Sequence, residues 1–582
     1  MVIDFSERPI DRQVSAFLCR NVPGDIEPVR TILSLLSQAV GQGSICLDLA
    51  EIAGNTVRRS SGSEMLLPGL DHLRSIVQAL PSVGRQGEHR PLVLDDEGRL
   101  YLYRYFRYQQ ILAGQIFSRT SSGSPEIDEP TLIKSLDRLF PQDGYGDDRQ
   151  RQAASTALKR RFSVISGGPG TGKTSTVVRI LCLLLEQPGG LRQRIAMAAP
   201  TGKAAARLSS SIVAIRESLQ CSGEANLAIP EQVTTIHRLL GTLPGSTGFR
   251  HSDRNPLPYD TVIVDEASMI DLPLMTALIT ALLPDARLIL LGDKEQLASV
   301  EAGAVLGDIC RAGETYGSVV ENCVTVLEKN YRFSEGSGIS ELSRAVNAGD
   351  DVEAMALMDA PGSTRISLEP LPNRDAIRRR IGVPLIDGYR GFLEAEDAAE
   401  ALRRFERFRI LCALRDGPWG AVGMNNVAET VLSSAGLLHV DGVFYCGRPL
   451  LVTENDYVHR LFNGDTGIIL PDPSNGSLRA YFAAADGSVR SLPPEFMPKH
   501  ETAFAMTVHK SQGSEFERVL MILPPEDKAL LTRELIYTGI TRAKESLTIW
   551  GDQSVFASAV RRRTERRSGL LDALGKRANL IF

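Results

Sequence analysis

The sequence lacks the features that would direct a chain into a membrane or out of the cell. No apolar run approaches the ~20 residues that a helix needs to cross a bilayer. The first twelve residues, MVIDFSERPIDR, are polar and contain no apolar segment typical of a signal peptide. The eight cysteines are scattered singly between Cys19 and Cys446 without a C-x-x-C pair, which favours free buried thiols. We therefore expect a cytoplasmic protein.

The sequence also lacks a surplus of positive charge. Its net charge of −5 does not indicate a nucleic-acid-binding protein. Binding depends on local charge, however, so a mildly acidic protein can still carry a basic groove. We find no internal repeat, no long low-complexity tract and no carboxylate cluster typical of a nuclease. An apolar content of 43% and a charged content of 23% are ordinary for a globular protein, and 582 residues suffice for several domains.

The first fifth of the chain carries no catalytic motif. Apolar residues at helical spacing, such as those at 32, 33, 35 and 36, predict a mainly helical N-terminal domain over residues 1–115. The aromatic run at 101–106 suits a core better than a ligand site. Segment 120–130 is rich in serine, glycine, proline and acidic residues, and segment 142–148 is rich in glycine and aspartate. We interpret both as linkers.

The rest of the chain alternates short apolar strands with helices, a pattern typical of parallel sheets covered on both faces. We predict an α/β protein with two such domains, over residues 116–330 and 331–582. Between about 440 and 500, turn residues separate short alternating strands, which indicates a small β-barrel inserted into the second domain. The predicted strands are 162–165, 194–198, 261–264 and 287–291 in the first domain, 408–412, 503–506, 519–523 and 547–550 in the second, and 466–470 and 479–482 in the barrel.

A phosphate-binding loop follows the first predicted strand and precedes an apolar helical run at 175–185, as the G-x-x-x-x-G-K-[ST] motif requires. Its glycines let backbone N–H groups face phosphates, and the helix N-terminus adds a partial positive charge. Lys173 is predicted to reach the β- and γ-phosphates of ATP, and Thr174 to bind Mg²⁺. The loop residues predicted to hold ATP are Gly167, Gly168, Pro169, Gly170, Thr171, Gly172, Lys173 and Thr174.

An acidic pair ends the strand predicted at 261–264. Asp265 lies at the carboxyl end of an apolar strand, where ligand sites form in α/β proteins, and is predicted to hold the Mg²⁺ shell. Glu266 is the predicted general base that orients and deprotonates the attacking water. The alternative is a surface acidic pair, which the upstream phosphate loop makes the weaker interpretation. A small-molecule kinase would explain the loop but not the second α/β domain.

Several further segments resemble, in order and spacing, the motifs of superfamily 1B helicases. Their amino-acid sequences resemble those of the RecD family within that superfamily. The resemblance covers about residues 145–550. It implies two RecA-like motor domains, a small 1B insertion in the first and an SH3-like insertion in the second. The segments are GGPGTGKT, APTGKAAARL, TIHRLLG, VDEASMIDLP, GDKEQLASVEAGAVLGDIC, NYRF, FNGDTGI, VHKSQGSEF and YTGITRA.

The same resemblance assigns roles at the ATP site. It implies that Gln150 contacts the adenine, although a glutamine taken alone favours a solvated helix position. Gln296 would sense the γ-phosphate or the attacking water. Arg332 and Arg542 would be arginine fingers, a role suited to a guanidinium because its rigid fork never loses its charge. Gly513 and Glu515 would lie near the nucleotide and couple it to DNA.

The resemblance also implies a DNA track across both motor domains, bordered by the inserted barrel. Hydroxyls, backbone N–H groups and a few cations suit a phosphate backbone that is bound without sequence preference. Without the resemblance, His237 is more typical of a histidine that caps a helix. Lys203 could equally be a solvated helix residue. The inserted barrel could be a peripheral subdomain that does not contact DNA. The residues predicted to contact DNA are Pro200, Thr201, Lys203, His237, Thr507, His509 and Lys510.

Three functions compete. The first is a 5′→3′ helicase subunit in a heterotrimer with RecB and RecC, one copy of each. It would act on single-stranded DNA at duplex ends. Its roles would be double-strand break repair by homologous recombination and degradation of linear DNA. Residues 1–115 would dock onto RecC, and the nuclease would lie in another chain. The second is a free-standing 1B helicase, but residues 1–115 lack the G-x-G hairpins of such relatives. The third is a regulatory subunit with an inactive ATPase, against which the intact Lys173, Asp265, Glu266, Arg332 and Arg542 argue.

Overall fold

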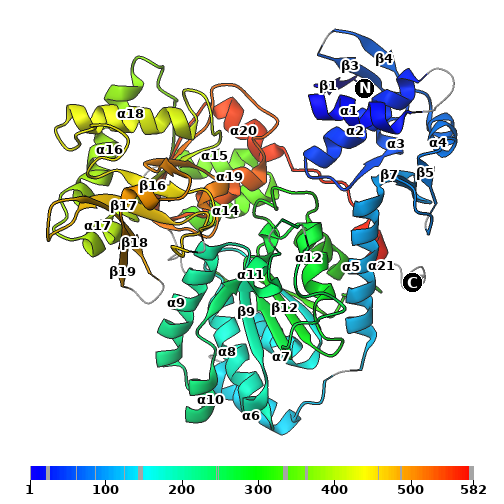
Figure 1. The fold of residues 1–582 in the computed structure, drawn as a ribbon, viewed down its shortest axis with the longest axis horizontal. Helices are drawn as coiled ribbons and strands as arrows, with labels where there is room; N and C mark the ends of the chain where they lie inside the picture. The colour runs from blue at the N-terminus through cyan, green and yellow to red at the C-terminus, as the bar shows by residue number, and fades with distance from the viewer. Residues whose placement is uncertain are drawn as a thin grey trace.

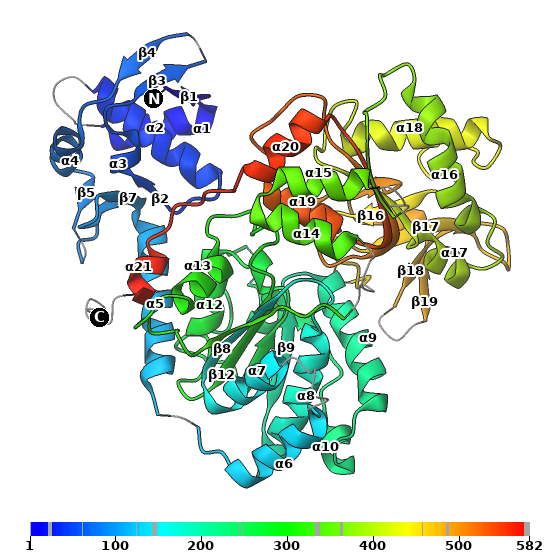
Figure 2. The same cartoon turned by 180° about the vertical axis from the view of Figure 1, so that it is seen from behind.

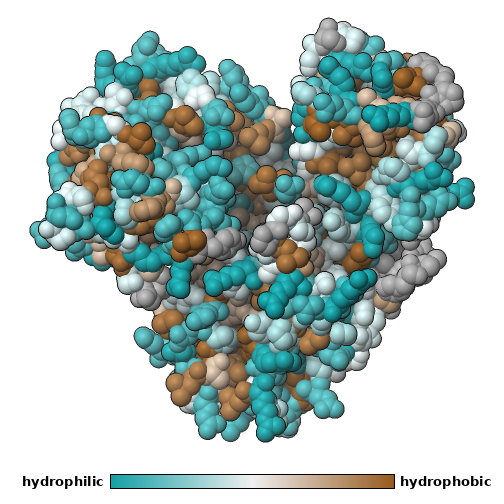
Figure 3. Space-filling model, in the orientation of Figure 1, coloured by the Kyte–Doolittle hydropathy of each residue, from teal (hydrophilic) through white to brown (hydrophobic). Residues whose placement is uncertain are grey.

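The chain folds into three lobes, with the N-terminal part and the second α/β domain standing on either side above the first α/β domain (Figure 1). The space-filling view shows a deep notch between the two upper lobes (Figure 3). The computed structural model describes residues 2–20, 26–60, 62–85, 87–123, 125–141, 148–243, 245–246, 248–331, 338–360, 365–456, 458–484 and 488–575.

The first α/β domain is built on a six-stranded sheet in the order β10-β9-β11-β12-β8-β13, in which all strands are parallel. The four strands predicted here are confirmed. Parallel order places the carboxyl ends of all strands at one edge of the sheet, where a ligand site can form. The strands are β8 (Phe162–Gly167), β9 (Ile195–Ala199), β10 (Val233–Thr235), β11 (Thr261–Val264), β12 (Arg287–Gly292) and β13 (Val324–Leu327).

Helices cover both faces of this sheet because its strands are apolar on both sides. Ile165 and Ile289 point into one buried core, while Val164 and Leu288 point into the other. Each such side chain contributes about 1.5–3 kcal/mol when fully buried. The first core is covered by α6 (Glu129–Leu139), α7 (Asp148–Lys159), α8 (Lys173–Glu186), α9 (Gly202–Ser218) and α10 (Gly223–Ala228), and the second by α5 (Tyr103–Ser121), α11 (Ile236–Leu240), α12 (Leu272–Thr280) and α13 (Val305–Gly313).

The second α/β domain repeats this plan with a five-stranded parallel sheet in the order β14-β23-β22-β15-β21. The strand predicted at 503–506 begins two residues later. The strands are β14 (Ile366–Glu369), β15 (Phe408–Cys412), β21 (Ala505–Thr507), β22 (Phe516–Ile522) and β23 (Ala543–Trp550). Its helices are α14 (Ile339–Ala348), α15 (Asp351–Asp359), α16 (Ile377–Leu393), α17 (Ala398–Phe405), α18 (Ala421–Ser434), α19 (Arg533–Ile540) and α20 (Gln553–Arg561).

The insertion predicted near 440–500 is a five-stranded antiparallel sheet in the order β19-β18-β17-β16-β20. Leu450, Ile469 and Phe482 form part of its own small core. This pairing is that of an open sheet, so closure into an SH3-like barrel stays a prediction. The strands are β16 (Pro449–Val452), β17 (Thr466–Pro471), β18 (Leu478–Ala483), β19 (Val489–Leu492) and β20 (His500–Thr502).

The N-terminal part mixes helices with strands, so the mainly helical domain expected for residues 1–115 is not confirmed. Two small sheets, β1-β3-β4 and β2-β7-β6-β5, accompany its helices. Strand pairing here is non-local, as between Val2 and Thr56, so helical spacing alone could not reveal it. The elements are β1 (Val2–Phe5), α1 (Pro9–Leu18), α2 (Glu27–Gly41), β2 (Cys46–Asp48), α3 (Leu49–Ile52), β3 (Thr56–Arg59), β4 (Glu64–Leu66), α4 (Leu70–Gln78), β5 (Val83–Gly84), β6 (Leu92–Leu94) and β7 (Arg99–Leu102).

Helix α5 joins the N-terminal part to the first α/β domain. It runs without interruption through residue 115 and packs against α12, so the boundary that we predicted there falls inside a helix. Tyr101 and Tyr105 in the aromatic run are buried, which confirms a core role. The chain returns to α5 at its end, because the segment after α20 crosses from the second domain and α21 (Leu570–Gly575) packs on α5 and α13 (Figure 2). An ion pair between Arg99 and Asp572 fixes this return.

Two chemical expectations can be compared with the structure. Cys182 on α8 is disulfide-bonded to Cys221, so the expectation of free thiols throughout is wrong for this pair. The other cysteines are free, and all of them except Cys446 are buried. None of the described helices is both long and apolar enough to cross a membrane.

Candidate nucleotide site and DNA-contact residues

The phosphate loop connects β8 to the N-terminus of α8, as predicted. Gly170 and Gly172 have φ values of 83° and 82°, a left-handed conformation that favours glycine. Gly172 also lies against the side-chain amide of Gln150, which leaves no room for a Cβ atom. The Lys173 ammonium donates to the carbonyl oxygens of Gly167 and Gly168, at 2.5 and 3.0 Å. The loop thus holds its lysine against its own backbone carbonyl groups.

The acidic pair follows β11, two strands away from β8 in the sheet. Burial, reinforced by the neighbouring Glu266 carboxylate, raises the pKa of Asp265 to about 6. The Asp265 carboxylate accepts a hydrogen bond of 2.8 Å from the backbone N–H of Glu266. Glu266 itself has a φ of 52°, which is rare for a residue with a side chain and is typical of functional positions.

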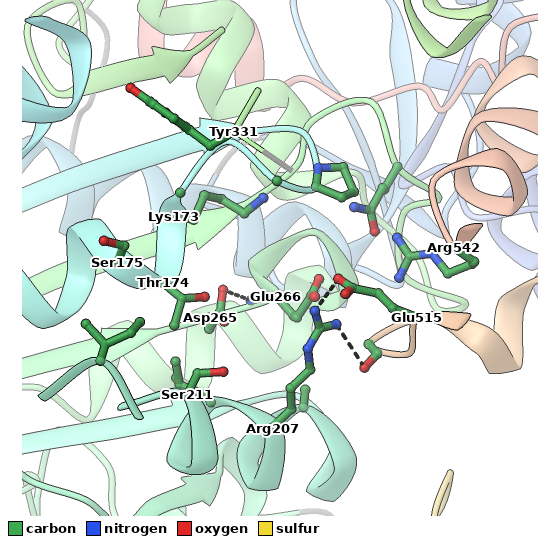
Figure 4. Close-up of a pocket in the computed structure, with 18 residues that line it drawn as sticks. Lys173, Thr174, Ser175, Arg207, Ser211, Asp265, Glu266, Tyr331, Glu515 and Arg542 are labelled. Carbon is green, nitrogen blue, oxygen red and sulfur yellow. Dashed lines mark hydrogen bonds and ion pairs between the residues drawn. The ribbon is translucent and has the colours of Figure 1, made fainter. Parts of the chain in front are cut away.

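Both α/β domains line one cavity of about 350 Å³ (Figure 4). The first domain contributes the phosphate loop, the acidic pair and Gln296, whereas the second contributes Gly513, Glu515 and Arg542, with Tyr331 at the predicted domain boundary. The sequence-predicted residues that line it are Pro169, Gly170, Gly172, Lys173, Thr174, Asp265, Glu266, Gln296, Gly513, Glu515 and Arg542. Gln150, Gly167, Gly168 and Thr171 do not line the cavity itself, and Arg332 lies outside the described residues.

Arg542 is held rigidly at the cavity wall. Only 2% of this residue is exposed, and burial lowers the pKa of its guanidinium. Its three nitrogens donate to the carbonyl oxygens of Thr538 and Ser514 and to the hydroxyl of Thr541, at 3.1, 3.1 and 3.3 Å. The guanidinium is therefore preorganised before any ligand arrives.

Sequence reasoning missed Arg207, although it lies in a segment already singled out. Arg207 on α9 forms an ion pair with Glu515 of the second domain, and its guanidinium also donates to the carbonyl oxygen of Gly513 at 3.4 Å. Burial opposes the charge of Arg207, but the Glu515 carboxylate outweighs it and raises the pKa. Its position one helical turn after Lys203 was the available signal. The other lining residues that were missed are Ser175, Ala204, Leu208, Ser211, Ile215 and Tyr331.

Three of the predicted DNA contacts lie where α9 begins. Thr201 caps this helix, because its hydroxyl accepts a hydrogen bond of 3.2 Å from the N–H of Ala204. Lys203 is half-buried beside Gly464 of the inserted sheet, and burial lowers its pKa. Pro200 directly follows β9 and is also half-buried. The insertion is thus in contact with the start of α9.

The remaining predicted DNA contacts are divided between the domains. His237 is exposed on α11 beside Phe249, with ring centroids 5.9 Å apart. Thr507 ends β21 and is buried, so its hydroxyl accepts from the N–H of Lys510 at 3.3 Å rather than facing outward. The Lys510 ammonium donates to Glu501 at 2.6 Å, and burial lowers the pKa of His509. The structure does not bring all seven residues into one described cavity.

Known proteins match this chain along most of its length. A protein of Mycobacterium tuberculosis (strain CDC 1551 / Oshkosh), named RecBCD enzyme subunit RecD, is 38% identical over 567 residues, covering 96% of this chain and 93% of that protein. The chain belongs to the RecD family. A RecD subunit of Haemophilus influenzae is 36% identical, covering 81% of this chain and 80% of that protein. The ATP-dependent RecD2 DNA helicase of Deinococcus radiodurans is 29% identical, covering 82% of this chain and 59% of that protein.

Three family matches divide this RecD-family chain as the fold does. Residues 7–101 match the N-terminal domain of RecBCD enzyme subunit RecD, 150–302 an AAA domain, and 502–550 the UvrD-like helicase C-terminal domain. The second and third ranges contain nearly all the residues that line the cavity. The chain is therefore a DNA helicase subunit of the RecBCD type with ATPase activity.

Proposed function

We propose that this RecD-family chain is an ATP-driven 5′→3′ DNA translocase and that the cavity between its α/β domains is the motor site. The observation that carries this proposal is the division of the cavity between the domains: Lys173, Asp265 and Glu266 come from the first, and Glu515 and Arg542 from the second. ATP bound by both walls would favour domain closure, and hydrolysis would remove that preference.

The residues present are suited to Mg²⁺. The Thr174 hydroxyl and the Asp265 carboxylate line the same cavity, and such hard oxygen ligands suit this ion. A bound Mg²⁺ would neutralise charge on the β- and γ-phosphates. Its positive charge would also keep Asp265 ionised, against the burial that raises the pKa of this carboxyl.

The chain's own residues divide the chemistry. Lys173 binds phosphate oxygens, and Glu266 orients the attacking water and accepts its proton. Arg542, already held by three acceptors, stabilises the charge that develops on the transferred group without reorganisation of its own. Arg332 is proposed as a second arginine finger from the sequence alone.

The decisive experiment replaces Lys173 with Gln. The variant should fold, because the ammonium contacts only loop carbonyls, and should lose ATP hydrolysis while part of its single-stranded DNA binding survives. Wild-type hydrolysis by a correctly folded K173Q protein would contradict the assignment of the site. Arg192→Gln is a matched control, since this residue lies on a surface turn away from the cavity.

We also propose that single-stranded DNA follows the start of α9 and the segment after β21, with the inserted sheet as an SH3-like neighbour of the track. Contact between the insertion and α9 supports this path, because Gly202 packs directly on Phe462 and Lys203 lies beside Gly464. Lys203 and Lys510 would supply charge, while backbone N–H groups would contact phosphates.

RecB and RecC are the proposed partners, in a heterotrimer with one copy of each subunit. The match to RecD subunits over most of both chains supports a subunit rather than a free-standing helicase, since the RecD2 relative is covered over only 59% of its length. Intact site residues argue against a non-catalytic subunit. Repair of double-strand breaks, degradation of linear DNA by a nuclease in another subunit and a cytoplasmic location stay predictions. Co-purification from the native cell would test the assembly.

The N-terminal part is the proposed docking surface for RecC. Three of its apolar side chains are strongly exposed: Ile10 at 52%, Phe17 at 59% and Leu66 at 70%. A stable interface buries on the order of 1,200–2,000 Å², which a domain of this size can supply.

A further inference from the structure

Tyr537 is a buried tyrosine that crosses from the second α/β domain to the first. It lies on α19, and its hydroxyl donates to the Asp293 carboxylate, which follows β12, at 3.0 Å. The hydroxyl also lies against the phosphate loop, because a Cβ atom added to Gly168 would come within 2.8 Å of it. One phenol therefore contacts both the loop and the segment that leads to Gln296.

Asp293 determines how the Gln296 amide is oriented. The Asp293 oxygen that accepts from Tyr537 also accepts from the Gln296 side-chain nitrogen at 3.0 Å, while the other oxygen accepts from the N–H of Glu295 at 3.1 Å. Burial raises the pKa of Asp293, but three donors converge on this carboxyl and Lys173 lies close by, which favours the ionised form that only accepts. The NH₂ group of Gln296 must then face Asp293, and its carbonyl oxygen must face away.

The free end of this glutamine is placed for catalysis. Gln296 lines the cavity, and its carbonyl oxygen is buried without a hydrogen-bond partner among the described residues. A buried acceptor without a partner is costly unless a ligand or water supplies a donor. A water that attacks the γ-phosphate is such a donor, and glutamines orient the attacking water in related phosphoryl-transfer enzymes.

The second domain also holds the residue that follows Gln296, through α19 and through Gln512. The Thr538 hydroxyl accepts from the N–H of Leu297 at 3.0 Å, and the Gln512 amide donates to the carbonyl oxygen of Leu297 at 2.9 Å. The carbonyl oxygen of Thr538 accepts from Arg542. Movement of the second domain would therefore withdraw Arg542 and release Gln296 together.

We propose that Tyr537 is a positioning residue that makes ATP hydrolysis depend on contact between the two α/β domains, through the chain Tyr537–Asp293–Gln296. With the domains in contact, the phenol holds Asp293, which turns the Gln296 carbonyl toward the attacking water. When the second domain moves away, Asp293 loses this donor and Gln296 loses its fixed orientation. This inference rests on the proposed function of the cavity.

Tyr537→Phe tests the chain because it removes only the hydroxyl. We expect kcat of the DNA-stimulated ATPase to fall about tenfold, the effect of one lost hydrogen bond to a charged group. KM for ATP and the Kd for single-stranded DNA should stay within about twofold of wild type, because the phenol touches neither ligand. Tyr445→Phe is the matched control: this buried hydroxyl donates to Glu429 in the same domain, away from the cavity, and should leave kcat unchanged.

A double-mutant cycle separates positioning from a general loss of stability. Asp293→Asn should lower kcat, and adding Tyr537→Phe to it should cost little more, since both act through one chain. Additive losses, a wild-type kcat in Tyr537→Phe, or a KM that rises in proportion to the fall in kcat would each overturn the inference. Lys173→Gln measured alongside distinguishes the two failures: an inactive K173Q protein with an unaffected Y537F protein refutes the positioning role alone, whereas an active K173Q protein refutes the site itself.

Discussion

Replacement of Arg542 is the sharpest test of how the two domains cooperate. This arginine belongs to the second α/β domain, yet its side chain forms part of the cavity wall opposite Lys173 of the first. The residue is 2% exposed, and its guanidinium makes three hydrogen bonds within its own domain. Arg542→Ala removes both the charge at the cavity and the donors of those three bonds.

The two consequences differ in size. Each acceptor left unpaired costs about 1–3 kcal/mol when no water replaces the lost donor. The cavity admits water, so we expect a net loss in the free energy of unfolding of about 2–3 kcal/mol. Loss of a finger arginine lowers kcat on the order of 10³-fold, which corresponds to about 4 kcal/mol of transition-state stabilisation. The effect on rate should therefore exceed the effect on stability.

Arg542→Lys separates charge from geometry. Lysine retains a cation but lacks the planar fork that reaches the acceptors at Thr538, Ser514 and Thr541 together, so we expect most of the loss in kcat to persist. The assay is steady-state ATPase activity with saturating single-stranded DNA, with ATP affinity measured separately and unfolding followed by denaturant. Equal losses in kcat and ATP affinity, or wild-type activity in either variant, would refute the assignment of Arg542 to the transition state.

Four further outcomes are expected. Glu266→Gln should abolish hydrolysis and preserve ATP binding, because it removes the proton acceptor but little volume; retained turnover would exclude Glu266 as the base. ATPase activity should rise with single-stranded DNA, and the DNA concentration needed should increase with salt as counterion release weakens binding; a salt-independent response would argue against phosphate contacts. Unwinding should require a 5′ overhang, and unwinding from a 3′ overhang alone would reverse the proposed polarity. Phe17→Glu with Leu66→Glu should reduce co-purification with RecC, whereas Leu227→Glu, at an even more exposed leucine on α10, should not; equal recovery would move the interface elsewhere.

Much of the nucleotide site could be predicted from local sequence because its parts are local. The phosphate loop needs a strand before it and a helix after it, and both elements lie within residues 162–186. Asp265 and Glu266 follow an apolar strand directly, so their place at the sheet edge also follows from the sequence. Such short-range patterns predict which residues lie at the sheet edge, because parallel strands bring their carboxyl ends to one edge.

The contacts that the sequence could not predict are those between segments far apart in the chain. Tyr537 meets Asp293 across 244 residues, and Arg207 meets Glu515 across 308. The bond between Cys182 and Cys221 and the pairing of Val2 with Thr56 are likewise set by how helices and strands pack. The amino-acid sequence by itself determined which residues could bind phosphate, hold a metal or move a proton. Only the tertiary structure decided which partners orient them, because hydrogen bonds between domains depend on packing over hundreds of residues and leave no periodic signal in the chain.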